Sequence, residues 1–118
     1  MKYIDGFVLP VPKKNLKAYA KISKIAGKVW KDHGALEYRE CVGEDLDLKF
    51  GIPFPKLVSP KKGETIIFSW ILYKSRAHRD RVNAKVMKDP RLTSMCNEKM
   101  PFDCNRMHMG GFEVFVDM

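Results

Sequence analysis

The stretch Thr65–Tyr73 reads Thr-Ile-Ile-Phe-Ser-Trp-Ile-Leu-Tyr, and it decides the fold. It is rich in β-branched and aromatic residues and carries no charge, which is typical of a strand inside a sheet. Its odd and even positions are both apolar, so a strand at this place needs cover on two faces. We expect one cover from the helices of the same chain and the other from a second copy of the protein.

Length and composition are those of an ordinary globular protein. The chain has 118 residues, of which 45% are hydrophobic and 31% charged, and we expect one domain over residues 1–118. Thr65–Tyr73 is the longest uncharged apolar run, and it is too short to cross a bilayer. The N-terminus lacks an apolar signal core, which predicts a cytoplasmic protein without a membrane partner.

Cysteine and histidine give no sign of a metal or cofactor site. Cys41, Cys96 and Cys104 are an odd number without a paired spacing, so free thiols are expected rather than disulfides. Neither residue type falls into the spacing of metal ligands, and no phosphate-binding or nucleophile motif is present. Cys104 follows Phe102-Asp103 in a predicted loop, but only Arg106 lies near enough in sequence to lower its pKa.

Before the central stretch, the pattern predicts one strand, a long helix and a second strand. The first strand is Tyr3–Leu9, which we expect Pro10 and Pro12 to end because proline cannot donate to a ladder. The helix covers Lys13–His33, with Gly34 in the place of a left-handed C-terminal cap. Its inward stripe contains Leu16, Tyr19, Ala20, Ser23, Ala26, Val29, Trp30 and His33, widened by Ile22 and Ile25. The second strand is Ala35–Gly43, and the segment Glu44–Glu64 follows it.

Glu44–Glu64 is proline-rich yet too apolar for a free linker, so we expect it to pack as an arm against the body or a partner. Asp45 and Asp47 suggest a calcium loop, but the required glycine and later glutamate are missing, which favours an exposed loop.

After the central stretch, the pattern predicts two helices and a last strand. Ser75 is placed to cap a helix over Arg76–Lys88, and Asp89-Pro90 to begin a short helix over Pro90–Met95. The last strand is Arg106–Val116, where Gly110-Gly111 predicts a bulge or a close backbone approach.

This order of elements is strand, helix, strand, repeated once, which is the split βαβ pattern of ferredoxin-like α+β folds. Right-handed crossovers place both long helices on one face of a four-stranded antiparallel sheet. The other face is then bare, with either Ile66, Phe68, Trp70 and Leu72 or Ile67, Ser69, Ile71 and Tyr73 exposed on its third strand. Two such faces packed together predict a symmetric homodimer.

Motifs spread over nearly the whole chain carry a family resemblance. They are Met1-Lys2-Tyr3-Ile4-Asp5-Gly6-Phe7-Val8, Phe68-Ser69-Trp70-Ile71, Arg79-Asp80, Asn83, Asp89-Pro90-Arg91, Met100-Pro101-Phe102-Asp103, Arg106-Met107 and Gly110-Gly111-Phe112-Glu113. Together they are similar to those of the YbaA-like family of uncharacterised bacterial proteins; Asp47–Lys62 is the least similar part. The resemblance implies a dimeric α/β barrel and supplies no catalytic residues, because the family has no established activity.

The wider group that shares this fold includes haem-degrading and antibiotic-biosynthesis monooxygenases, although fold alone is a poor guide to chemistry. Haem-degrading members use an asparagine, a tryptophan and a histidine. Here Asp5 stands where that asparagine is expected, and His78 lies nearer to Trp70 than the pattern requires. Both departures argue against haem chemistry.

The first candidate site is a pocket between sheet and helices. Its proposed lining is Asp5, Trp70, Asn83, Arg106 and His108, because polar groups on apolar elements must find partners or bind a ligand. For Trp70, Arg106 and His108 an ordinary core or rim position is the favoured alternative.

The second candidate is proton transfer by His33, at a helix C-terminus, and Glu40, which alternates with apolar residues and is expected to have a raised pKa. For each of these two a structural role is favoured.

The third candidate is the basic surface, since the formal net charge is +8. The lysines of Lys13–His33 and the cations Arg76, Arg79, Arg81, Lys85 and Lys88 are predicted to form adjacent outer faces that attract phosphate. The faces lack interleaved aromatic residues, so a solvated helix face is favoured over an RNA-binding one.

The leading hypothesis is a small, partly apolar ligand bound by a cytoplasmic homodimer, as a binding protein or a cofactor-independent enzyme. An RNA- or anion-binding module and a monooxygenase are the alternatives.

Overall fold

The computed structural model describes residues 1–118. Its elements, in chain order, are β1 Tyr3–Pro12, a 3-10 turn at Lys13–Asn15, α1 Leu16–Asp32, β2 Glu37–Val42, α2 Phe54–Val58, β3 Glu64–Tyr73, α3 Arg76–Val86, α4 Pro90–Cys96, a 3-10 turn at Cys104–Arg106 and β4 His108–Glu113. Each predicted strand and helix is present, and α2 is an addition within the segment that the pattern left irregular. None of the helices combines the length and the apolar composition that a membrane crossing needs.

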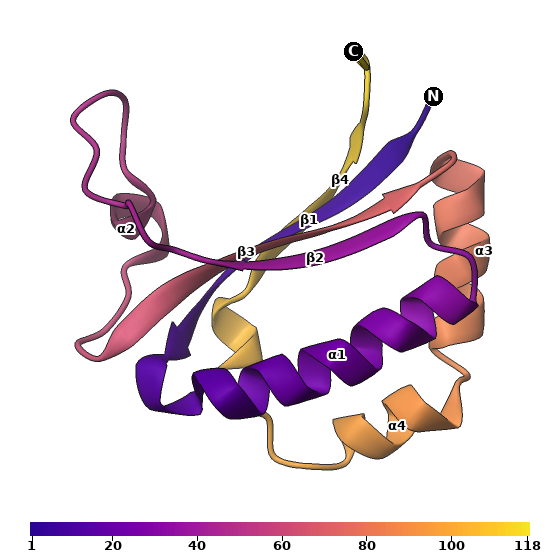
Figure 1. Ribbon diagram of the computed structural model, residues 1–118, viewed down its shortest axis with the longest axis horizontal. Helices are drawn as coiled ribbons and strands as arrows, with labels where there is room; N and C mark the ends of the chain where they lie inside the picture. The colour runs from indigo at the N-terminus through magenta and orange to yellow at the C-terminus, as the bar shows by residue number, and fades with distance from the viewer.

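The four strands form one antiparallel sheet in the order β2-β3-β1-β4, and α1, α3 and α4 lie on one of its faces (Figure 1). This is the ferredoxin-like α+β arrangement that the order of elements predicted. We call the face toward these helices the helix face and the other one the open face.

The pairing register decides which side of β3 meets the helices. Tyr73 pairs with Tyr3, and Ile71 pairs with Asp5 and Tyr38, so the odd-numbered residues of β3 share the helix face with those partners. The even-numbered residues therefore lie on the open face, which settles the alternative that the sequence left open. They are Ile66, Phe68, Trp70 and Leu72.

Contrary to the prediction, Pro10 and Pro12 do not end β1, which pairs with β3 as far as Pro12 opposite Glu64. The backbone N–H of Lys13 donates to the Gly63 carbonyl, so in this strand the odd-numbered residues donate toward β3. The two prolines therefore direct their missing donors toward the other side, where β4 pairs only as far as Val8. No ladder bond is lost, because nothing is paired there.

The inward row of α1 is narrower than predicted. The helix buries Tyr19, Ser23, Gly27 and the predicted Val29, whereas the predicted Ala20 is exposed and Ile25 is 39% exposed. Both lie beside that row rather than on it. The predicted cap is confirmed, because Gly34 follows the helix with φ +114°.

The segment after β2 crosses to the open face, where α2 lies on the side of the sheet away from α1 (Figure 1). Val58 of α2 is buried, and the ring of Phe54 meets that of Phe68 edge to face at 6.3 Å between centroids. Phe50 and Ile52, in the loop before α2, are 98% and 83% exposed. The arm expected here thus packs against the body through α2, while its tip remains uncovered.

β4 is shorter than Arg106–Val116 and contains no bulge, since Gly110 pairs with Gly6 and Gly111 with Asp5 in regular register. The predicted close approach is present, because a Cβ atom on Gly111 would collide with the Tyr3 hydroxyl. Glycine at this position therefore makes room for a buried tyrosine of the neighbouring strand.

The core on the helix face is divided into two clusters of buried side chains. One is built around Tyr3, Val29, Ala35, Ile71, Tyr73, Val82, Val86 and Leu92, and the other around Leu9, Val11, Tyr19 and Ile67. Phe7 packs against both. A cavity remains between the two clusters.

Candidate functional site

A cavity of about 190 Å³ lies between the sheet and the helices, and members of both core clusters line it. Of its 18 lining residues 15 are hydrophobic. β1 and β3 contribute Phe7, Leu9, Ser69, Trp70 and Ile71; α1 contributes Tyr19, Ile22, Ser23, Ala26 and Trp30; and β2 contributes Tyr38 and Glu40. The segment from α4 to the residue before β4 contributes Leu92, Met95, Cys96, Met100, Phe102 and Met107.

The polar end of the cavity is built around the carboxylate of Glu40. The hydroxyl of Tyr19 donates to its Oε1 at 2.7 Å, and the hydroxyl of Tyr38 donates to its Oε2 at 2.7 Å. Ser69 pairs with Glu40 across the β2–β3 ladder and borders the same cavity. Ser23 of α1 borders it too, so the site combines one carboxylate, two phenols and two serine hydroxyls with an otherwise apolar wall.

Local structure explains how these groups meet. Tyr38 and Glu40 are two residues apart on β2, so both point to the helix face. Gly27 allows α1 to lie against the Tyr38 ring, because a Cβ atom there would come within 2.9 Å of Tyr38 Cδ1. Burial, reinforced by the negative charge of Glu40, raises the pKa of both Tyr19 and Tyr38 above the usual phenol range. Both hydroxyls therefore keep their protons at neutral pH.

The structure does not bring the five residues of the first predicted pocket together. Asp5 is 5% exposed and accepts a hydrogen bond from Arg79 Nη1 at 2.8 Å, under α3 and outside the cavity. Asn83 also lies outside the cavity, and its Oδ1 accepts from Trp30 Nε1 at 3.1 Å and from the Tyr73 hydroxyl at 3.2 Å. Asn83 therefore holds Trp30, a residue of the cavity wall, in place.

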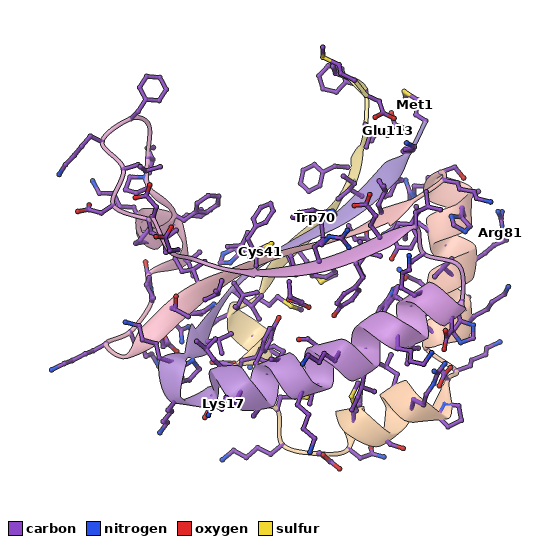
Figure 2. The ribbon with its side chains drawn as sticks, viewed as in Figure 1. Met1, Lys17, Cys41, Trp70, Arg81 and Glu113 are labelled. Atoms are coloured by element: carbon purple, nitrogen blue, oxygen red, sulfur yellow. The ribbon has the colours of Figure 1, made fainter.

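The other three residues of that pocket lie elsewhere. Trp70 borders the cavity from β3, but the register directs its side chain to the open face, where its ring meets that of Phe68 at 5.9 Å (Figure 2). His108 is exposed at the start of β4, on the open face. Arg106 forms a bidentate ion pair with Glu64 at 2.8 and 2.9 Å. Asp5 and Trp70 thus point to opposite faces of the sheet.

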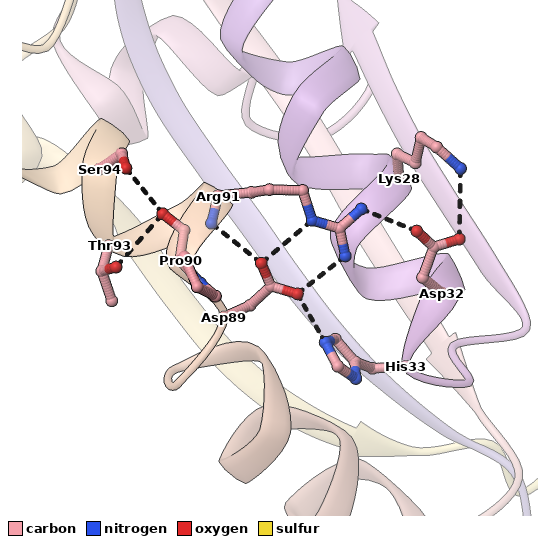
Figure 3. A network of polar contacts seen from close by, with 8 residues as sticks. All are labelled: Lys28, Asp32, His33, Asp89, Pro90, Arg91, Thr93 and Ser94. Atoms are coloured by element: carbon pink, nitrogen blue, oxygen red, sulfur yellow. Dashed lines mark hydrogen bonds and ion pairs between the residues drawn. The ribbon is translucent and has the colours of Figure 1, made fainter.

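The predicted proton-transfer pair is also separated. Glu40 lies in the cavity, whereas His33 caps the C-terminus of α1 and its Nε2 lies 2.8 Å from Asp89 Oδ2 (Figure 3). Asp89 caps α4 through the backbone N–H of Arg91, and the Arg91 side chain pairs with both Asp89 and Asp32. This network joins α1 to α4 and so holds one wall of the cavity.

We expect this junction to stabilise the fold at neutral pH and to lose that contribution as the pH falls. Hydrogen bonds from Arg91 and then His33 hold the pKa of Asp89 well below its usual range. A carboxyl whose pKa is lower in the folded state stabilises the fold above its unfolded pKa and loses that contribution as the pH falls. The melting temperature of Asp89→Asn should therefore lie below that of the unchanged protein at about pH 7, and the gap should shrink between about pH 5 and pH 2. Thermal unfolding followed by circular dichroism measures it.

Asparagine remains a good N-cap, so this variant tests the charge rather than the cap. Asp47→Asn, in the exposed loop after β2, is the control and should show no gap at any pH. A gap for Asp89→Asn that stays constant down to about pH 2 would contradict the assignment.

The basic surface is interrupted by ion pairs. Lys17 and Arg81 point away from the sheet (Figure 2), but Arg79, predicted to lie on the outer face, turns inward to Asp5. Lys28 and Arg91 pair with Asp32, and Arg76 with Asp80. Lys24, Lys28, Lys31 and Arg39 line a shallow groove of about 500 Å³ on the outer side of Glu40.

The sequence contains a pattern that marks the polar end of this cavity, but the predicted pocket was not based on it. Tyr38 and Glu40 share a strand face, and Tyr19 and Ser23 share a helix row, so polar tips recur on two inward surfaces. The lining methionines and Phe102 come from a segment without periodicity, and no pattern marked them.

Residues 2–104 match the family model described as "Protein of unknown function (DUF1428)". The chain is 41% identical over 117 residues to the uncharacterized protein YbaA of Escherichia coli strain K12, covering 99% of each chain, and equally to YbaA of Shigella flexneri. An uncharacterized NIPSNAP domain protein from Burkholderia xenovorans has a similar structure, with a TM-score of 0.60 at 12% identity over 98% of this chain and 99% of that one. At that identity the likeness shows the fold alone.

Proposed function

The chain belongs to the DUF1428 family, whose function is unknown, and we propose that it binds a small, mainly apolar ligand in the cavity between sheet and helices. The observation that carries this proposal is an apolar cavity of about 190 Å³ with a few polar groups at one end. Ligand sites in proteins have this composition, in which apolar walls give affinity and a few polar groups fix orientation.

The size of the cavity limits the ligand. Apolar cavities of about 150 Å³ accept a molecule as large as benzene. A cavity of about 190 Å³ therefore fits one aromatic ring, or a branched aliphatic group, with a short polar substituent. Three flexible methionines, Met95, Met100 and Met107, allow the wall to adjust to such a guest.

Ala26→Phe tests the proposal, because the added ring fills the cavity from α1. We expect 2-phenylethanol to bind the unchanged protein and to shift methyl NMR signals of the lining residues Leu9, Ile71 and Leu92. Ala26→Phe should remove these shifts.

Ala18→Phe is the matched control, since Ala18 lies on the exposed side of the same helix and the variant should bind normally. The shifts of the unchanged protein give a result even if Ala26→Phe does not fold. Shifts confined to open-face residues, or no shifts with a panel of single-ring compounds, would overturn the proposal.

We also propose that the protein is a homodimer whose open faces pack together. Phe68 is 44% exposed and Phe112 is 63% exposed on this face, beside a hollow of about 640 Å³. Apolar sheet faces of this kind are association sites, and a two-fold axis matches each face to its own copy. The free thiols of Cys41, Cys96 and Cys104 fit the reducing cytoplasm, where we place this dimer.

A further inference from the structure

The carboxylate of Glu40 has no positive partner in the protein. Every ion pair of the structure involves another acidic group, namely Asp5, Asp32, Glu64, Asp80, Asp89 or Asp117. Glu40 is partly buried and faces an apolar cavity, where a charge is expected to be paired. Its only partners are the hydroxyls of Tyr19 and Tyr38. The protein thus leaves one negative charge at the end of its cavity without a counter-charge.

In the cluster of Tyr19, Tyr38 and Glu40, both phenol hydroxyls are donors and the carboxylate is the acceptor. Tyr19 and Tyr38 each give their only hydroxyl hydrogen to Glu40, so their oxygens and the carboxylate can only accept further bonds. A ligand group that meets Glu40 and the two phenols must therefore supply N–H or O–H donors, whereas the hydroxyls of Ser23 and Ser69 on the same cavity wall can donate or accept. A carboxylate or phosphate would be repelled, because it brings a second negative charge and no donor.

A bare metal ion does not fit the site. Nowhere in the structure do three or more histidine, cysteine, aspartate or glutamate side chains gather to hold one. A single carboxylate surrounded by tyrosines and apolar side chains instead suits an organic cation. Its charged head would meet Glu40, while its apolar body would fill the space between Phe7, Trp30 and Phe102.

We propose that the cavity binds a small primary amine that carries one aromatic or branched apolar group, with its ammonium hydrogen-bonded to Glu40. This proposal rests on the proposed function and names the class of ligand for the same site. The three N–H donors of an ammonium match the Glu40 carboxylate and the two phenol oxygens.

Glu40 also borders the outer groove, where Lys24, Lys28, Lys31 and Arg39 lie. None of these cations lies within ion-pair distance of Glu40, so its carboxylate remains free to meet an ammonium from the cavity side.

Three ligands of nearly equal shape test the proposal by calorimetric titration at about pH 7.5, where an alkyl amine is protonated. They are 2-phenylethylamine, 2-phenylethanol and phenylacetate. We expect the amine to bind about tenfold more tightly than the alcohol or better, because the opposite charges of ammonium and Glu40 add to the hydrogen bond, and phenylacetate not to bind. Glu40→Gln should remove most of this preference, lowering the affinity for the amine about tenfold more than that for the alcohol.

Glu37→Gln is the matched control on the same strand, because the register directs Glu37 to the open face, and it should change none of the affinities. The comparison of the three ligands on the unchanged protein gives a result even if Glu40→Gln does not fold. If none of the three binds, the proposed function itself fails. If the alcohol binds as tightly as the amine, or if Glu40→Gln keeps the preference for the amine, only the present inference is overturned.

Discussion

A protein that carries Phe68→Asp is expected to be a monomer at concentrations at which the unchanged protein is a dimer. Phe68 lies on the central strand β3, on the open face, between the rings of Phe54 and Trp70. In the proposed dimer, symmetry buries two copies of the new carboxylate in an apolar interface without partners. Each copy costs several kcal/mol, so the dissociation constant should rise by roughly a thousandfold or more.

Size-exclusion chromatography with light scattering measures this directly. The unchanged protein should have twice the chain mass of 13.6 kDa, and the variant that mass alone. Met87→Asp is the control, because Met87 is also an exposed apolar residue, 57% accessible, but follows α3 on the opposite side of the sheet. Phe112→Asp, on the edge strand β4, provides a second disruption if Phe68→Asp unfolds. An unchanged protein of single-chain mass at micromolar concentration, or a dimer that survives both substitutions, would refute the proposed interface.

Asn83→Leu is expected to make the folded protein markedly less stable. The Asn83 side chain accepts hydrogen bonds from Trp30 Nε1 and from the hydroxyl of Tyr73, which is fully buried. Leucine has a similar volume but removes the Asn83 acceptor from both donors, at a cost of about 1–3 kcal/mol for a buried donor and less for the partly exposed indole. We expect unfolding to become easier by roughly 3 kcal/mol, which lowers the melting temperature by roughly 10 °C.

Two further variants separate the lost hydrogen bonds from other effects. Asn97→Leu, at an exposed asparagine after α4, should shift the melting temperature little. Tyr73→Phe in the Asn83→Leu background removes one of the unpaired donors and should restore part of the stability. An Asn83→Leu protein that melts within about 2 °C of the unchanged one would show that the two donors find other partners.

The elements of this fold follow from local sequence features. Ser75 caps α3 by accepting from the His78 backbone, and Asp89 caps α4, because each cap needs only residues within one turn. Gly34 ends α1 for the same kind of local reason. The order of these elements then limits the topology, since right-handed crossovers allow few arrangements. The α2 helix was missed because its packing on the open face, rather than its own pattern, stabilises it.

The candidate site was predicted less well, because its residues are distant in sequence. Tyr19 and Glu40 are 21 positions apart and meet only when α1 packs across β2. Asp5 and Trp70 were grouped as one pocket although the β1–β3 register places them on opposite faces. The sequence shows which polar residues stand among apolar ones on a strand or helix. It does not show which distant residue each of them will pair with.

The sequence by itself determined that Thr65–Tyr73 is a strand with two apolar faces, inside a sheet whose helices cover only one of them. Strand character and two-sided apolarity depend on neighbouring residues alone, so they can be read without the fold. Only the tertiary structure decided that Ser69 and Ile71 line a cavity while Phe68 and Trp70 form the open face. The physical reason is that side-chain orientation alternates along a strand, and the face that a residue joins is set by its pairing with distant strands.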